Sequence, residues 1–329
     1  MGSSPPDFPE APVLPTGAFD DPPALPAIGA RRLRSRPWRH LVLFLLTVVT
    51  TTLAGASHWA SFQNDFTEHS FDFPYYLHGL WYSSSILAIL GAHEFGHYFA
   101  CRYYRVNASL PYFLPVPLPL TGTLGAFIRI RQPIPGKRAL FDIGIAGPIA
   151  GFLVALPLLI AGVSLSRIET PPTDLPANVV SYVLGFPTLI QGLIWLIWGS
   201  PADSVTFNMH PIAFAGWFGL LATALNLFPI GQLDGGHISY AVLGRKSTLV
   251  TFGTMICLIA LTFVSSSWIV WTVLTAAMLL TFGPNHPRTY DEEVPLDRTR
   301  LWLAFVALLM FILCFTPSPI EQFDLVGRR

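Results

Sequence analysis

The stretch Ala92-His93-Glu94-Phe95-Gly96-His97-Tyr98 places three ionisable side chains inside an otherwise apolar segment. On a helix, His93 and His97 lie one turn apart on the same face, so both imidazoles can reach one metal ion. Glu94 lies beside them, where a carboxylate can take a proton from a water at the metal. Ionisable groups cost roughly 2.5–3.5 kcal/mol each at membrane depth. Their grouping at metal-ligand spacing therefore indicates a function, although a bare His-Glu-x-x-His pattern can also arise by chance on a soluble helix.

The composition is that of an integral membrane protein. Of the 329 residues, 52% are hydrophobic and only 12% are charged, about half the usual share in soluble proteins. The formal net charge is zero, which gives no reason to expect nucleic-acid binding. Cys101, Cys257 and Cys314 lie far apart and form no Cys-x-x-Cys pair, so we expect small apolar fillers and neither disulfides nor a thiolate zinc site.

Apolar runs predict an all-α polytopic membrane fold with about seven transmembrane helices. The predicted spans are residues 40–56, 75–104, 141–163, 210–228, 247–264, 268–282 and 301–315. A further apolar run, residues 188–198, is short, and we expect it to lie in the membrane interface or to dip into the membrane.

Charge placement predicts the orientation. Five arginines within residues 31–39 precede the first span, and basic residues stay on the cytoplasmic side. With the amino terminus inside and seven crossings, only Arg167, Arg328 and Arg329 of the 19 Lys and Arg residues lie outside. No transit peptide is recognisable, which favours a bacterial-type plasma (inner) membrane over an organelle.

The chain divides into four predicted parts. The first is a Pro-rich cytoplasmic tail with the basic cluster, which cannot bury a core and should be disordered. The second holds the first transmembrane helix and an outside loop, the third the intramembrane core with the His-Glu-x-x-His motif, and the fourth additional transmembrane helices. Their bounds are residues 1–39, 40–74, 75–245 and 246–329.

Residues 110–131 are apolar but not helical. Residues 110–120 hold too many prolines for a helix, and residues 121–131 show partial alternation with β-favouring types. Beside a metal site such a stretch predicts a re-entrant loop or hairpin; the alternative is an ordinary cytoplasmic loop. Asp142, near the start of the next span, is expected to complement the helix dipole as a structural group.

A second motif supplies the remaining site candidates. A catalytic zinc usually has three protein ligands, and Asp234 is the best third candidate because it follows a span broken by Pro229 and Gly231 at the depth of the histidines. Asn226 is placed to donate a hydrogen bond to a developing oxyanion. His237 is nearby, but we expect it to be a partner for Asp234 or for backbone groups.

These motifs resemble those of the site-2 protease family of intramembrane zinc metalloproteases. His93-Glu94-Phe95-Gly96-His97 is similar to the first motif of that family, and the segment from Asn226 to Gly236 is similar to the second. Residues 122–126 and 141–148 also resemble segments of members of that family. The similarity covers roughly residues 75–245.

By this resemblance, His93, His97 and Asp234 are ligands of one Zn²⁺ per chain, Glu94 is the catalytic base, and Asn226 orients the substrate or its oxyanion. It also implies peptide-bond hydrolysis in or near single-span segments of other membrane proteins, usually after a first cut outside. The sequence shows no room for a PDZ domain in residues 164–209. It does not disclose the physiological substrate or the oligomeric state.

Three other functions compete with an active intramembrane protease. A catalytically inactive relative that binds membrane proteins is disfavoured by the intact Glu94. A metal transporter could be lined by His93, His97 and Asp234, but it has no need of a base directly after the first histidine. A prenyl-protein protease would need another Glu or His ligand in place of the motif from Asn226 to Gly236.

Overall fold

The computed structural model describes residues 37–64, 73–170, 182–200, 205–284, 289, 291 and 293–322. The predicted disordered tail up to residue 36, the acidic part of the first outside loop and the carboxyl-terminal arginines lie outside these ranges. All described residues belong to one compact unit.

Most of the described chain is helical. The helices are α1 (Pro37–Gln63), α2 (Phe73–Tyr76), α3 (Leu80–Tyr103), α4 (Lys137–Leu165), α5 (Thr188–Trp198), α6 (Pro211–Asn226), α7 (Asp234–Leu243), α8 (Ser247–Leu261), α9 (Ser267–Phe282) and α10 (Arg298–Cys314), with 3₁₀ turns η1 (Leu77–Gly79) and η2 (Gly244–Lys246). Each predicted span falls largely on one of these helices, so the prediction of a helical fold is confirmed.

Three described helices are long and apolar enough to cross a membrane, namely Pro37–Gln63, Lys137–Leu165 and the continuous run Asp234–Leu261. The expectation of about seven spans is therefore not confirmed. Helices α6, α9 and α10 have 16, 16 and 17 residues, fewer than the ~20 that a straight crossing needs. Helix α3 is long enough, but its serines and its His-Glu-x-x-His residues lower its hydropathy.

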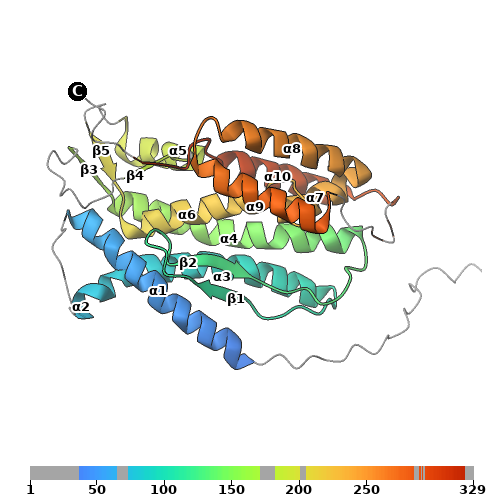
Figure 1. The fold of residues 1–329 in the computed structure, drawn as a ribbon, viewed down its shortest axis with the longest axis horizontal. Coiled ribbons are helices and arrows are strands. Elements are labelled where there is room, and N and C mark those ends of the chain that lie inside the picture. Colours follow the sequence, from blue (N-terminus) through green and yellow to red (C-terminus); the bar gives the residue numbers. More distant parts are fainter. Residues whose placement is uncertain are drawn as a thin grey trace, which may run out of the picture. The chain divides into compact units, whose positions relative to one another are not determined.

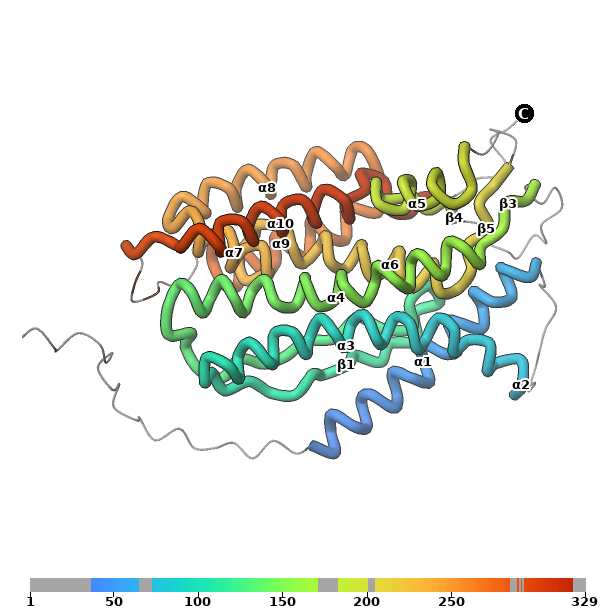
Figure 2. Tube along the Cα trace, turned by 180° about the vertical axis from the view of Figure 1, so that it is seen from behind, coloured from blue at the N-terminus to red at the C-terminus, as the bar shows by residue number. Residues whose placement is uncertain are grey.

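Helices α3, α4 and α6 run side by side through the centre of the unit (Figures 1 and 2). Their shared core includes Tyr82 and Ile89 of α3, Leu159 of α4, and Trp217 and Leu220 of α6, all fully buried. Helices α8, α9 and α10 lie on one side of this layer, and α1 crosses obliquely on the other side (Figure 1). The metal-ligand candidates of α3 thus lie on a central helix.

A β-hairpin fills the space between α1 and α3, where the sequence predicted a loop or hairpin. Strands β1 (Tyr112–Pro115) and β2 (Thr123–Phe127) pair antiparallel. Its tip is held by both α3 and α1, because the Tyr82 hydroxyl donates to the Thr121 carbonyl at 3.0 Å and a ring nitrogen of His58 lies 2.9 Å from the Leu120 carbonyl oxygen. Whether the hairpin re-enters a bilayer stays a prediction.

Two short strand pairs that involve the segment 164–209 were not predicted. Strand β3 (Arg167–Glu169) pairs with β5 (Thr206–Asn208), and β4 (Tyr182–Leu184) pairs with β6 (Ile320–Gln322). The run predicted to lie in or dip into the membrane interface forms the 11-residue helix α5 between them. These pairs join distant parts of the chain, which explains why local patterns did not predict them.

The three cysteines are free, as expected, but they are not alike. Cys101 and Cys314 are buried, whereas Cys257 is exposed on α8. The prediction of an apolar filler therefore fits Cys101 and Cys314, whereas Cys257 lies on an exposed part of α8.

Asp142 has a different partner from the one expected. Its carboxylate accepts a hydrogen bond from Arg300 Nε at 2.9 Å and another from the Tyr104 hydroxyl, and both carboxylate and guanidinium are mostly buried. Asp297 caps α10 by accepting from the Arg300 backbone N–H at 3.1 Å. Asp142 thus binds the start of α10 to the start of α4 by a charge pair that connects residues 158 positions apart.

We expect Arg300→Met to destabilise the protein by about 1–3 kcal/mol, because the mutation leaves the mostly buried Asp142 carboxylate without its charged donor. The measurement is the thermal unfolding midpoint in detergent. The matched control is Arg298→Met on the same helix, whose side chain is exposed. Equal midpoints for the two variants would contradict a stabilising role for the Asp142–Arg300 pair.

Candidate metal centre

Three helices bring the candidate residues together. Helix α3 carries His93, Glu94 and His97; Asp234 is the first residue of α7; Asn226 is the last residue of α6. The carboxylate of Asp234 at a helix N-terminus also complements the helix dipole.

The turn between α6 and α7 reverses the chain so that Asp234 returns to α3. Leu227 N donates to Thr223 O at 3.0 Å, which ends α6, and Leu233 N donates to Ile230 O at 3.1 Å within the turn. Gly231 adopts a positive φ of 51°, a conformation that glycine tolerates at little cost. These local bonds supply partners for backbone groups that the broken helix leaves open.

The ligand atoms of His93, His97 and Asp234 converge. Asp234 Oδ2 lies 3.1 Å from His93 Nε2 and 3.2 Å from His97 Nε2, and the two Nε2 atoms are 3.1 Å apart. Both histidines are buried and Asp234 is nearly so. Among the described residues, this is the one group of three or more His, Cys, Asp or Glu side chains close enough to share a metal ion.

The donor set fits zinc. Ligand atoms at 2.0–2.2 Å from a tetrahedral ion lie about 3.3–3.6 Å from one another, slightly more than the three distances here. His97 Nδ1 lies 2.7 Å from the Ile143 carbonyl oxygen, and this bond places the proton on Nδ1. Nε2 of neutral His97 therefore keeps its lone pair toward the convergence point. Two imidazoles and one carboxylate leave a fourth position open, as in catalytic zinc sites.

Glu94 is buried at the same centre without joining the ligand group. Its carboxylate accepts a hydrogen bond from the backbone of Ile128, the residue after strand β2. The hairpin therefore covers the side of α3 on which Glu94 lies. The carboxylate interacts electrostatically with His97 and Asp234, and no ion pair joins it to a Lys or Arg among the described residues.

Asn226 reaches the centre from the end of α6. Its Nδ2 lies 3.4 Å from His93 Nε2, a long contact that places the amide at the edge of the ligand group. The structure thus brings all five predicted site residues to one place. His237 is not in the ligand group; its Cβ instead packs at the surface of Gly144 on α4.

Helix α4 shapes the space for the imidazoles, which the sequence did not predict. A Cβ on Gly147 would overlap the His97 ring at Nε2, and a Cβ on Gly151 would lie 3.2 Å from His93 Cβ. The sequence predicted only that small residues on this span allow close helix packing. The spacing Gly144, Gly147 and Gly151, one helical turn apart, was the available signal.

The fold and the site define a helical membrane-type metalloprotein with a His-Glu-x-x-His helix and a distant aspartate. The family model for Peptidase family M50 matches residues 81–265. The chain belongs to this family, that of the site-2 zinc metalloproteases. The resemblance seen in the motifs, and with it zinc as the cofactor of the family, is confirmed.

Curated relatives carry matching names. The chain is 32% identical over 249 residues to the probable zinc metalloprotease EGY2, chloroplastic, of Oryza sativa subsp. indica. This match covers 72% of the chain and 44% of the relative. It is 30% identical to the EGY2 protein of Arabidopsis thaliana (70% and 40% covered) and 36% identical to EGY1 of Arabidopsis thaliana (51% and 30% covered). The chain therefore spans less than half the length of these relatives.

We expect Gly147→Ala to lower bound zinc at least tenfold, because the added methyl group occupies the position of His97 Nε2. Zinc content after purification in detergent measures the effect. Gly253→Ala is the matched control, since it is also a helical glycine and has no heavy atom within 4 Å of the added Cβ. Full zinc occupancy in Gly147→Ala would show that the His97 ring does not need this space.

We expect Asp234→Ala to lower zinc affinity by roughly 10–100-fold or more, since the open site would lose its only anionic ligand candidate. The zinc affinity of Asp234→Asn, which keeps the shape of the side chain but not its charge, should lie between those of wild type and Asp234→Ala. Metal titration of the purified protein measures both affinities. Unchanged affinity in Asp234→Ala would reject this residue as a ligand.

Proposed function

We propose that the protein is a zinc metalloendopeptidase that hydrolyses peptide bonds in or near membrane-spanning segments of other membrane proteins. The observation that carries the proposal is the buried convergence of His93, His97 and Asp234 with Glu94 beside them. Membership of Peptidase family M50 and relatives named as probable zinc metalloproteases support it.

In the proposed reaction, His93 Nε2, His97 Nε2 and Asp234 Oδ2 hold the zinc ion. When bound there, zinc supplies Lewis-acid chemistry that acidifies water and polarises a carbonyl group. Glu94 accepts a proton from the attacking water at a carboxylate oxygen and passes it to the leaving amine nitrogen. Its hydrogen bond from Ile128 orients the carboxylate without neutralising it.

We assign Asn226 the role of hydrogen-bond donor to the oxyanion. Its Nδ2 is 3.4 Å from His93 Nε2, so a substrate carbonyl oxygen bound beside the ligand group would lie within reach of the amide. An amide donor stabilises negative charge without a proton transfer, which suits a site where Glu94 already carries the proton.

The substrate class follows from the surroundings of the site. The site lies on helix α3, in the central layer of a largely apolar helical unit, so an extended soluble chain is a less suitable substrate than a membrane-inserted segment that locally unwinds. We propose single-span membrane proteins as substrates, in contact with the lipid bilayer.

We also propose that the metal centre lies near the cytoplasmic side, with the amino-terminal side of the chain inside. Support comes from basic residues next to the site-bearing elements: Arg102 and Arg105 follow the ligand pair, and Arg129 and Arg131 follow β2. The relatives are named chloroplastic, so the expected bacterial inner membrane gains no support and the location is restricted here to a membrane.

We expect Glu94→Gln to keep its zinc and to lose at least about 100-fold in cleavage of a single-span substrate in detergent, because the amide cannot accept the proton. Zinc content and the cleavage rate are measured on the same preparation. Cleavage at the wild-type rate would remove Glu94 from the mechanism. Wild-type protein that binds zinc but cleaves no substrate would favour the inactive-relative or transporter alternatives.

A further inference from the structure

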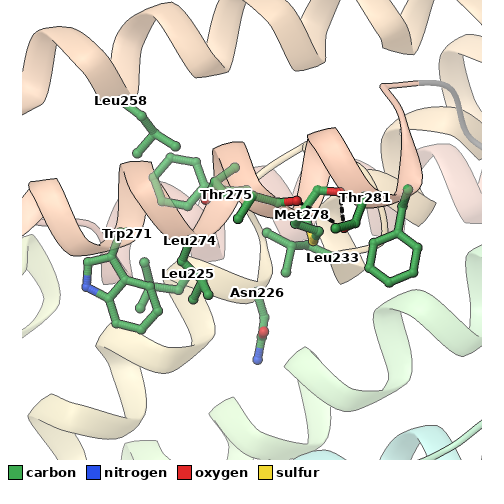
Figure 3. A pocket seen from close by; sticks show the side chains of 12 residues that line it. Leu225, Asn226, Leu233, Leu258, Trp271, Leu274, Thr275, Met278 and Thr281 are labelled. Atoms are coloured by element: carbon green, nitrogen blue, oxygen red, sulfur yellow. Dashed lines mark hydrogen bonds between the residues drawn. The ribbon is translucent and has the colours of Figure 1, made fainter.

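A cavity of about 450 Å³ lies between the end of α6, α8 and α9, next to the metal centre (Figure 3). Its walls include Leu225 and Asn226 of α6, Leu258 of α8, and Trp271, Leu274 and Met278 of α9. Its volume is in the range of pockets that enclose a small ligand. None of the catalytic roles proposed above uses this space.

The cavity and the metal centre share a wall. Asn226 lines the cavity, and its Nδ2 lies 3.4 Å from His93 Nε2. Figure 3 shows the Asn226 amide extending away from the labelled side chains of α9. Leu233 also lines the cavity and directly precedes the ligand candidate Asp234 in the chain. A peptide whose carbonyl lies at the Asn226 amide therefore has a neighbouring side chain within reach of the cavity.

The chemistry of the walls selects for apolar groups. Leucine, methionine, phenylalanine and tryptophan side chains dominate the lining, and no Asp, Glu, Lys, Arg or His is among the described lining residues. The hydroxyl of Thr281 is already used, since it donates to the Ala277 and Met278 carbonyls at 3.0 Å. A charged side chain would lose its hydration here without gaining a partner.

The flexible Met278 gives this wall some adaptability. Its Cε would lie 3.1 Å from a Cβ on Gly231, so the side chain spans from α9 to the turn that precedes Asp234. Unbranched thioether side chains adjust to ligands of different shape. The cavity can therefore accept branched and aromatic side chains of somewhat different size.

We propose that this cavity is a specificity pocket that takes one large apolar side chain of the substrate, of the Leu, Met or Phe class, within two residues of the cleaved bond. The inference rests on the proposed proteolytic function and deepens it. Side chains of an extended peptide point alternately to opposite sides, so the two direct neighbours of the residue in the pocket point away from it.

The test uses the full-length protein in detergent with zinc bound. Single-span substrates carry either Phe or Ala at one position, scanned over the two residues on each side of the cleaved bond. Wild-type protein is expected to cleave the Phe form about tenfold or more faster, by kcat/KM, at one of these positions, since filling a hydrophobic pocket is worth this much. No such preference at any position would overturn the proposal.

The decisive variant is Ala277→Phe, which adds a ring at an exposed residue of α9 that lines the cavity. It should reduce the Phe-over-Ala preference to near parity, mainly by slowing the Phe substrate, with zinc content unchanged. The matched control is Leu280→Phe on the same helix, where the side chain is 87% exposed and does not line the cavity. This control should keep the wild-type preference.

The remaining outcomes distinguish a failure of the pocket proposal from a failure of the proposed proteolytic function. If Ala277→Phe slows both substrates equally, the cavity holds something other than the substrate side chain, such as a lipid tail, and the proposal fails. If Ala277→Phe does not fold, Met278→Ala replaces it. The enlarged cavity should raise the rate for a Trp substrate relative to a Phe substrate, compared with the same ratio in wild-type protein. An unchanged ratio would overturn the proposal. Absence of any cleavage that Glu94→Gln abolishes would instead refute the proposed function and the pocket with it.

Discussion

The close packing of α4 against α3 is the constraint on which the candidate site depends. At Gly147 the surface of α4 leaves just enough room for the His97 ring. One turn earlier, the Ile143 carbonyl accepts a hydrogen bond from Nδ1–H of the same ring. Both features act on one imidazole, from two sides. They set its position and its tautomer before any metal binds, which reduces the cost of assembling a ligand group in a buried place.

The second requirement is that Asp234, which follows His97 by 137 residues in the chain, lies next to it in the fold. The chain meets it by ending α6 at Asn226 and starting α7 at Asp234, with a tight turn between them. Breaking a helix in an apolar unit exposes backbone groups, and the turn satisfies several of them locally. The same turn forms part of the apolar cavity beside the site, so one device supplies both a ligand candidate and a wall for the substrate.

Elements outside the central layer support the site from its edges. The β1–β2 hairpin is held at its tip by Tyr82 and His58 and reaches Glu94 through the Ile128 backbone near its other end. The Asp142–Arg300 pair fastens α10 to the start of α4, one residue before Ile143. The chain covers less than half of the length of its plant relatives, and these supports lie within the part of the chain that the structure describes.

The sequence by itself determined the membrane class, the helical fold, the zinc family and the five candidate residues, because these follow from composition and from two motifs with local spacing. Periodicity places His93 and His97 on one face, and a helix-breaking Pro229 marks where a buried carboxylate can turn inward. The number of membrane spans was predicted less well, since apolar runs assigned as spans form helices α6, α9 and α10 of only 16 or 17 residues. Only the tertiary structure decided the partner of Asp142, the fit of His97 against Gly147, the contact of Glu94 with Ile128 and the cavity beside Asn226. Each of these joins residues far apart in the chain, and such contacts depend on how helices pack, which no local pattern encodes.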